Sequence, residues 1–223
     1  MIELRRSHGR PFLIGHRGAR ALAPENTLES LEVAARHGVD GVEVDVLRRP
    51  DGRLVLAHGP EIPAGAPSLR EALALAAELG VFVQLDVKLR GAAPEIGRAV
   101  ADAGIADRTF VSSFSLETLE EFAAAAPELP RSFTYPARGL APAQRLVLPR
   151  RLAGWLRRAQ AAGLTLKWTV LDHRVIDAGH VLGAAVLAWT VNDPARAKSL
   201  VEAGIDAIIT DDPRIAPGGR SQT

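Results

Sequence analysis

The stretch AARHGVDGVEVDV, residues 34–46, contains the pattern that decides the fold. A helix-forming run ends at Gly38, and a run rich in β-branched residues follows almost at once. Glycine readily adopts the left-handed conformation that ends many helices, so Gly38 predicts a helix C-terminus. The valines that follow predict a strand.

The same junction recurs four more times, each time with a glycine between an Ala/Leu/Glu-rich run and a β-branched run. The four copies lie at residues 75–87, 100–114, 159–170 and 200–210. Helix starts are marked as well, because Asn26 with Glu29, Ser68 with Glu71, and Asp193 before Pro194 fit N-cap patterns. Regular alternation of helices with mostly apolar strands predicts parallel strands joined by βαβ crossovers.

Nine candidate strands can be counted. They are residues 12–15, 41–46, 54–58, 81–87, 109–114, 131–135, 165–170, 186–191 and 206–210. LVLAH, residues 54–58, follows its predecessor too closely for a crossover helix, so we expect a hairpin partner or an edge extension there. The other eight predict a (β/α)₈ TIM barrel with a short, reduced insertion after the second strand. A doubly wound sheet is the alternative, but no GxGxxG follows the first strand.

The composition narrows the class of protein. We expect a single domain over residues 1–223, with a core at about 12–213 and a disordered tail at 214–223. With 27 basic and 26 acidic residues the net charge is +1, which gives no case for nucleic acid as a partner. Cysteine is absent, which excludes disulfide and thiolate chemistry. No signal segment and no apolar run of roughly 20 residues is found, which predicts a cytoplasmic protein without integral membrane association. The oligomeric state stays open.

Polar side chains gather where the predicted strands end, and the carboxyl ends of barrel strands form one mouth. They are His16 and Arg17 after the first strand, Glu43 and Asp45 in the second, His58 at the end of LVLAH, and Asp86 and Lys88 at the end of VFVQLDVK. Residues two apart in a strand point to the same face. Three carboxylates that converge repel one another unless a cation binds them, and oxygen ligands favour Mg²⁺ or Ca²⁺ over zinc.

At these residues the chain resembles the glycerophosphodiester phosphodiesterase family. The family's pattern of HR, then ExD, then a further His is present as HRG (16–18), EVD (43–45) and LAH (56–58). Other segments that resemble the family are APENTLESLEVAARHGVDGVEVDV (23–46), FVSSFSLETLEEF (110–122), AWTVND (188–193) and GIDAIITDDP (204–213). Together they extend from about residue 12 to residue 213.

The resemblance implies hydrolysis of a small glycerophosphodiester to sn-glycerol 3-phosphate and an alcohol, with a divalent cation, Mg²⁺ or Ca²⁺, as cofactor. It implies metal ligation by Glu43, Asp45 and Asp86, acid/base catalysis by His16 and His58, and phosphate binding by Arg17 and Lys88. Which histidine is the acid, and whether water or the glycerol 2-hydroxyl attacks, stays open. Two other functions also stay open: a weak or inactive phosphodiester-binding barrel, and a phospholipase-type enzyme that forms a cyclic phosphate.

The chain departs from the family pattern at three places. Asp86 stands where the family usually has glutamate, Gly59 follows His58 in place of aspartate, and the segment 59–73 is much shorter than the usual insertion. A short insertion predicts a small lid and an open cleft, and hence a broad range of substrates or a large one. Glu25 and Trp189 are further candidates for substrate binding, whereas Asn192 is expected to be a turn residue.

Overall fold

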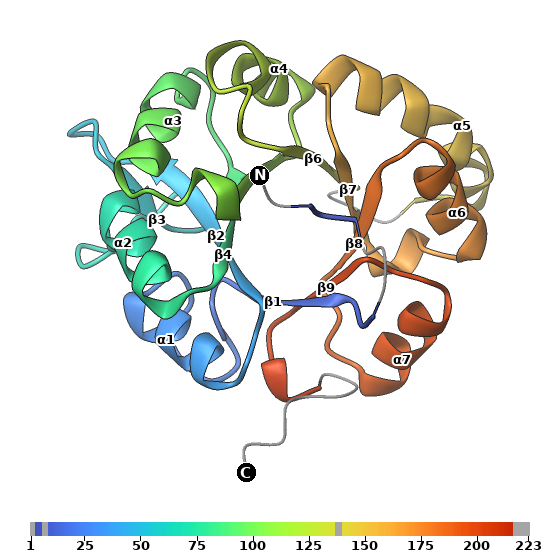
Figure 1. Ribbon diagram of the computed structural model, residues 1–223, viewed down its shortest axis with the longest axis horizontal. Helices are drawn as coiled ribbons and strands as arrows, with labels where there is room; N and C mark the ends of the chain where they lie inside the picture. Colours follow the sequence, from blue (N-terminus) through green and yellow to red (C-terminus); the bar gives the residue numbers. More distant parts are fainter. Residues whose placement is uncertain (1–2, 6–8, 137–139, 216–223) are drawn as a thin grey trace.

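Eight parallel strands close into a barrel, and helices surround it on the outside (Figure 1). The computed structural model describes residues 3–5, 9–136 and 140–215. The barrel strands are β1 (Phe12–His16), β2 (Gly41–Arg48), β4 (Phe82–Val87), β5 (Thr109–Ser113), β6 (Arg131–Tyr135), β7 (Gly163–Lys167), β8 (Ala185–Trp189) and β9 (Ala207–Thr210). Pairing of β1 with both β2 and β9 closes the ring, which confirms the predicted TIM barrel.

A helix follows each barrel strand except β9, after which the described chain ends in the 3-10 turn Pro213–Ile215. The helices are α1 (Leu28–Arg36), α2 (Leu69–Leu79), α3 (Ala93–Asp102), α4 (Leu116–Ala125), α5 (Pro142–Ala159), α6 (His173–Val181) and α7 (Pro194–Glu202). Short 3-10 turns at Ala106–Arg108 and Trp168–Val170 complete the described elements. None of the described helices is long and apolar enough to cross a bilayer.

The segment LVLAH forms β3 (Leu54–Leu56), which pairs antiparallel with the end of β2. This confirms the expected hairpin. Of the predicted tail, residues 214–215 end the last 3-10 turn, and residues 216–223 lie outside the described part of the chain. The single domain over the whole chain stays a prediction.

Two of the local predictions were wrong. Thr27, not Asn26, caps α1, and Ser30 takes the N3 position of its capping box in place of Glu29. Helix α5 ends at Ala159 and is capped by Gln160, which adopts the left-handed conformation with φ of 45°, whereas Gly163 is already the first residue of β7. The capping box of Ser68 and the N-cap of Asp193 are confirmed.

The apolar core has two parts. Outward-facing strand residues pack against the helices in one large cluster. A smaller cluster fills the barrel interior away from the carboxyl ends of the strands and includes Ile14, Phe82, Phe110, Leu187 and Ile209. Leu4 joins this inner cluster, and Figure 1 shows the described residues 3–5 lying across the barrel opening. One end is therefore plugged by apolar side chains, which leaves the opposite mouth for polar ones.

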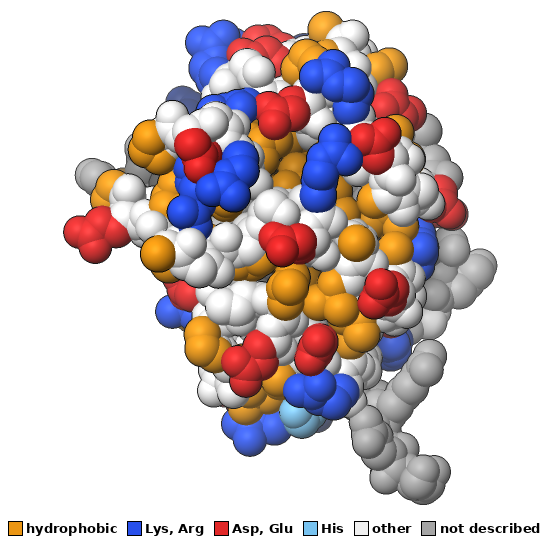
Figure 2. Space-filling model, turned by 90° about the vertical axis from the view of Figure 1, so that its left-hand side faces the viewer, with side chains coloured by type: hydrophobic (Ala, Val, Ile, Leu, Met, Phe, Trp, Pro, Cys, Tyr) orange, Lys and Arg blue, Asp and Glu red, His pale blue; other side chains and the backbone are white. Residues whose placement is uncertain are grey.

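The face over α2 and α3 carries charges of both signs side by side (Figure 2). Arg70 of α2, for example, bonds Asp102 of α3 at 2.8 Å, with both side chains exposed. Exposed pairs of this kind stabilise a fold by about 1 kcal/mol or less. A mixed surface of this kind offers no single-sign field to a polyanion on this face.

Candidate active site

A cavity of about 310 Å³ lies at the mouth formed by the strand ends. All seven residues predicted to ligate metal, hold phosphate or move protons line it, together with Trp189. The full lining is His16, Arg17, Glu43, Asp45, His58, Gln84, Asp86, Lys88, Phe114, Thr134, Thr165, Trp189 and Ile209. The i, i+2 spacing within β2 places Glu43 and Asp45 on one face, and residues at or just beyond the ends of β1, β3 and β4 join them.

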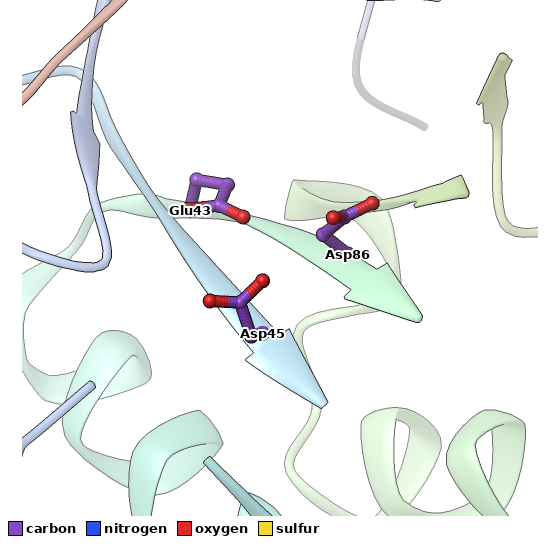
Figure 3. Close-up of side chains that lie close together, drawn as sticks. All are labelled: Glu43, Asp45 and Asp86. Atoms are coloured by element: carbon purple, nitrogen blue, oxygen red, sulfur yellow. The ribbon is translucent and has the colours of Figure 1, made fainter. Parts of the chain in front are cut away.

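Three buried carboxylates form the acidic cluster of the cavity, which consists of Glu43, Asp45 and Asp86 (Figure 3). Asp45 and Asp86 are direct partners in the β2–β4 register, and Glu43 lies two residues earlier on β2. Burial and the charge of Asp45 raise the pKa of Glu43 to about 7. Burial also raises the pKa of Asp86, against the opposing effect of Lys88. Burial acts in the same sense on Asp45, but Lys88 and Arg17 outweigh it and lower that pKa.

This cluster fits a hard divalent cation. One oxygen from each carboxylate can be chosen so that the three lie within 4.8 Å of one another. Oxygens bound to one Ca²⁺ lie at roughly 2.3–2.6 Å from it, and therefore at most about 5 Å apart. A donor set of three oxygens with no sulfur or nitrogen favours Mg²⁺ or Ca²⁺ over zinc.

Two cations neutralise part of this acidic cluster. Lys88 forms ion pairs with Asp86 and with Asp45, the latter at 3.0 Å. Although burial opposes it, the two aspartates raise the pKa of Lys88, so the ammonium is charged. Arg17 bonds both carboxylate oxygens of Glu25 at 2.9 Å, and its Nε lies 3.0 Å from Asp45. Glu25 therefore contacts the site through Arg17 and does not line the cavity.

The turn after β1 places Arg17 against β2. Arg17 and Gly18 both have positive φ, at 53° and 83°. The turn directs the backbone N–H of Arg17 to Glu43 Oε2 at 3.0 Å. A side chain at Gly18 would bring its Cβ within 2.3 Å of Ser30 Oγ, so glycine is required there.

Asn26 has a role that the sequence analysis assigned wrongly. With φ of 57°, it donates from Nδ2 to Asp45 Oδ2 and accepts the Asp45 backbone N–H, both at 3.0 Å. It is buried and holds one carboxylate of the acidic cluster in place. Asparagine favours helix caps and left-handed positions alike, and the neighbouring Thr27 takes the cap.

His16 belongs to a hydrogen-bonded chain that the sequence analysis missed. Its Nδ1 lies 2.6 Å from Asp211 Oδ1, and Asn192 donates from Nδ2 to the other oxygen of Asp211 at 2.6 Å. Despite partial burial, the hydrogen bonds from His16 and Asn192 lower the pKa of Asp211, so its carboxylate is ionised. An ionised partner at Nδ1 leaves Nε2 of His16 free to exchange a proton, and Nε2 lies 3.9 Å from Glu43 Oε2. Asn192 is thus more than the expected turn residue.

His58 approaches the cavity from the side, just beyond β3. It is more exposed than His16, and burial is the main cause of its lowered pKa, which the charge of Asp45 opposes. The two histidines thus come from β1 and from the β3 hairpin.

Two aromatic side chains form part of the cavity wall. Trp189 donates from Nε1 to the backbone oxygen of Thr165 at 3.2 Å and meets Phe114 edge to face, with ring centroids 5.6 Å apart. Lys88 Nζ lies 5.2 Å from the centroid of Phe114. Both rings line the cavity.

A TIM barrel whose mouth joins an acidic cluster, two cationic side chains and two histidines is an enzyme scaffold for an anionic ester. Comparison with known proteins narrows this class. The model of the glycerophosphoryl diester phosphodiesterase family matches residues 16–70 and 76–215, and the chain belongs to that family. This confirms the resemblance in the sequence and the prediction of a phosphodiesterase.

Several distant relatives match over nearly their full length. A glycerophosphodiester phosphodiesterase of Caldanaerobacter subterraneus is 24% identical, over 91% of this chain and 94% of the relative. One of Bacillus altitudinis is 25% identical, over 90% and 94%. The structure of a phosphodiesterase of Oleispira antarctica in complex with the product sn-glycerol-3-phosphate is 26% identical, covers 92% of this chain and 94% of that one, and has a TM-score of 0.75.

Proposed function

We propose that this protein hydrolyses small glycerophosphodiesters to sn-glycerol 3-phosphate and an alcohol, with a divalent cation as cofactor. The observation that carries the proposal is the convergence of the acidic cluster with His16, Arg17, His58 and Lys88 in one cavity. The product named in the Oleispira antarctica structure supports glycerol as one arm of the substrate.

Arg17 and Lys88 bind the phosphate in this proposal. Both have their cationic groups beside the acidic cluster, and both line the cavity. Charge-assisted hydrogen bonds from a guanidinium and an ammonium stabilise the extra negative charge that develops on the phosphoryl oxygens.

Glu43, Asp45 and Asp86 would hold the cation, which when bound supplies positive charge for the phosphoryl oxygens. The aspartate at position 86 reaches one methylene less than glutamate, yet its pairing with Asp45 keeps it within the cluster. The ion is Mg²⁺ or Ca²⁺ in this proposal.

His16 and His58 carry the two proton transfers: one takes a proton from the attacking hydroxyl, and the other gives a proton to the leaving oxygen. Asp211 stabilises the imidazolium of His16 through Nδ1. A bond forms between the attacking oxygen and phosphorus as the bond from phosphorus to the leaving oxygen breaks. With water as the nucleophile this gives glycerol 3-phosphate directly. With the glycerol 2-hydroxyl it gives a cyclic phosphate, which water opens to glycerol 3-phosphate in a second round of the same two transfers.

The test measures release of glycerol 3-phosphate from glycerophosphocholine and glycerophosphoethanolamine by purified protein in EDTA, Mg²⁺ or Ca²⁺. His16→Ala should abolish metal-dependent release, whereas His173→Ala, an exposed histidine on α6, should match the wild type. Absence of release with every metal contradicts the proposal and favours a binding barrel. Accumulation of a cyclic phosphate, read by ³¹P NMR, instead favours the phospholipase-type reaction.

A further inference from the structure

The cavity has a polar wall that the proposed chemistry leaves unused. Ser, Thr and Gln side chains project into the barrel from β4 to β7, whereas β8, β9 and β1 contribute Leu187, Ile209 and Ile14. The side chains of the polar wall are Gln84, Ser112, Ser132, Thr134 and Thr165. Barrel interiors are dominated by branched apolar side chains, so a buried polar wall on one side only requires a reason.

Most atoms of this polar wall satisfy one another. Gln84 Nε2 donates to Ser112 Oγ at 2.9 Å, and Ser112 Oγ donates to Asp86 Oδ1 at 2.9 Å. Ser132 Oγ and Thr165 Oγ1 share a hydrogen bond of 2.7 Å. Because the hydroxyl proton of Ser112 goes to Asp86, Ser112 can only accept from Gln84, which fixes the orientation of the Gln84 amide.

Two atoms of the wall have no hydrogen-bond partner within the described part of the chain: Gln84 Oε1 and Thr134 Oγ1. Their residues are 2% and 4% exposed, and both line the cavity. A buried polar atom without a partner costs free energy, so native proteins keep few of them unless a ligand or water completes the bond.

We propose that Gln84 and Thr134 form a subsite that binds the free primary hydroxyl of the glycerol arm, an inference that rests on the proposed function. Gln84 Oε1 can only accept a hydrogen bond, and the phosphoryl oxygens of an ionised diester carry no proton, so this atom must meet a donor. A glycerol hydroxyl is such a donor, and it can also accept from Thr134. Ile209 and Trp189 supply apolar surface for the carbon chain in the same cavity.

The test compares two substrates that share the ethanolamine headgroup. One is glycerophosphoethanolamine, and the other has propane-1,2-diol in place of glycerol, which removes the free primary (sn-1) hydroxyl and keeps the 2-hydroxyl for either route of attack. In the wild type the glycerol substrate should have the higher kcat/KM. Thr134→Val should lower kcat/KM for the glycerol substrate by about threefold to tenfold, the effect of one hydrogen bond, and leave the propanediol substrate unchanged.

Thermal unfolding separates this role from a structural one. Thr134→Val removes a hydroxyl that bonds nothing in the described protein, so its Tm should stay the same or rise. The matched control is Thr165→Val, which breaks the bond to Ser132, should lower Tm, and should not change the ratio between the two substrates. Gln84→Met offers a second probe of the same ratio.

The subsite is overturned when Thr134→Val lowers kcat/KM equally for both substrates, or when it lowers Tm as Thr165→Val does. A wild type that hydrolyses neither substrate refutes the proposed function instead. Calorimetric binding of sn-glycerol 3-phosphate and propane-1,2-diol 1-phosphate then tests the subsite without turnover. A loss of affinity on Thr134→Val for the first ligand alone supports it, and equal affinities overturn it.

Discussion

Glu43→Gln should remove a pH-dependent cost in the stability of the cation-free protein. Burial and Asp45 raise the pKa of Glu43 from 4.5 to about 7 in the folded state. Between these two values the folded chain binds more protons than the unfolded chain, so stability falls as pH rises through that window. A difference of roughly 2.5 pKa units corresponds to about 3 kcal/mol, because one unit is 1.36 kcal/mol.

The assay is thermal unfolding by circular dichroism at pH 5.0, 6.0 and 7.5 in EDTA, for the wild type and for Glu43→Gln. For a chain of this size about 3 kcal/mol corresponds to a Tm change of roughly 6–12 °C. The amide keeps an oxygen that can accept the N–H of Arg17, so the turn after β1 stays in place. The Tm of the wild type should therefore fall relative to that of the variant as pH rises.

Addition of Mg²⁺ or Ca²⁺ at pH 7.5 should restore the Tm of the wild type, since the cation binds the ionised form. The variant should gain less because it has lost one of the three proposed charged ligands. Parallel Tm profiles for the two proteins between pH 5.0 and 7.5 in EDTA would refute the reasoning. Glu43 would then carry no raised pKa in the folded protein.

Three further changes test other parts of the site. Asp211→Asn should lower kcat for release of glycerol 3-phosphate about a hundredfold, because it removes the charge-assisted hydrogen bond to His16, of about 3 kcal/mol. The control Asp212→Asn, which alters only the pair with Arg214, should keep a kcat near that of the wild type. Asn26→Ala should lower the free energy of unfolding by about 2–3 kcal/mol in urea titrations, since two buried hydrogen bonds are lost. An unchanged urea midpoint would contradict the role of Asn26 in holding Asp45 in place. Lys88→Met should destabilise the protein in EDTA by about 3–5 kcal/mol, because two buried aspartates lose their counter-charge. A divalent cation should recover part of this stability, and equal Tm values of the variant with and without cation would contradict that expectation.

Local patterns were sufficient for the barrel and for most of the acidic and basic side chains at its mouth. Glycines at helix ends and β-branched runs mark several of the repeats, and the spacing of Glu43 and Asp45 fixes their shared face. Asp211 was missed although it directly follows β9, because its contact with His16 depends on β1 pairing with β9. That pairing joins the two ends of the barrel, and no local pattern reveals it.

Other residues of the site were missed for different physical reasons. Asn26 carries two competing propensities, and only the packed turn shows that it holds Asp45 and leaves the cap to Thr27. Gln84 and Thr134 look like ordinary strand residues in the sequence. Their importance lies in what they lack, a hydrogen-bond partner in a buried position, and that becomes visible only when every neighbour has been placed.

The charge count of the cavity links the acidic cluster to the substrate. With the two histidines left aside, the charged side chains that line the cavity are Glu43, Asp45 and Asp86 against Arg17 and Lys88, so this set, when fully ionised, has one negative charge in excess. A phosphodiester adds a second, and in a partly buried cavity such an excess is unfavourable. The cation-free protein reduces it by keeping a proton on the acidic cluster, as the pKa of about 7 for Glu43 shows. A divalent cation displaces that proton and brings the sum with bound substrate to zero. Proton and cation therefore compete for the same site, and substrate affinity should rise with cation occupancy most strongly near and below pH 7.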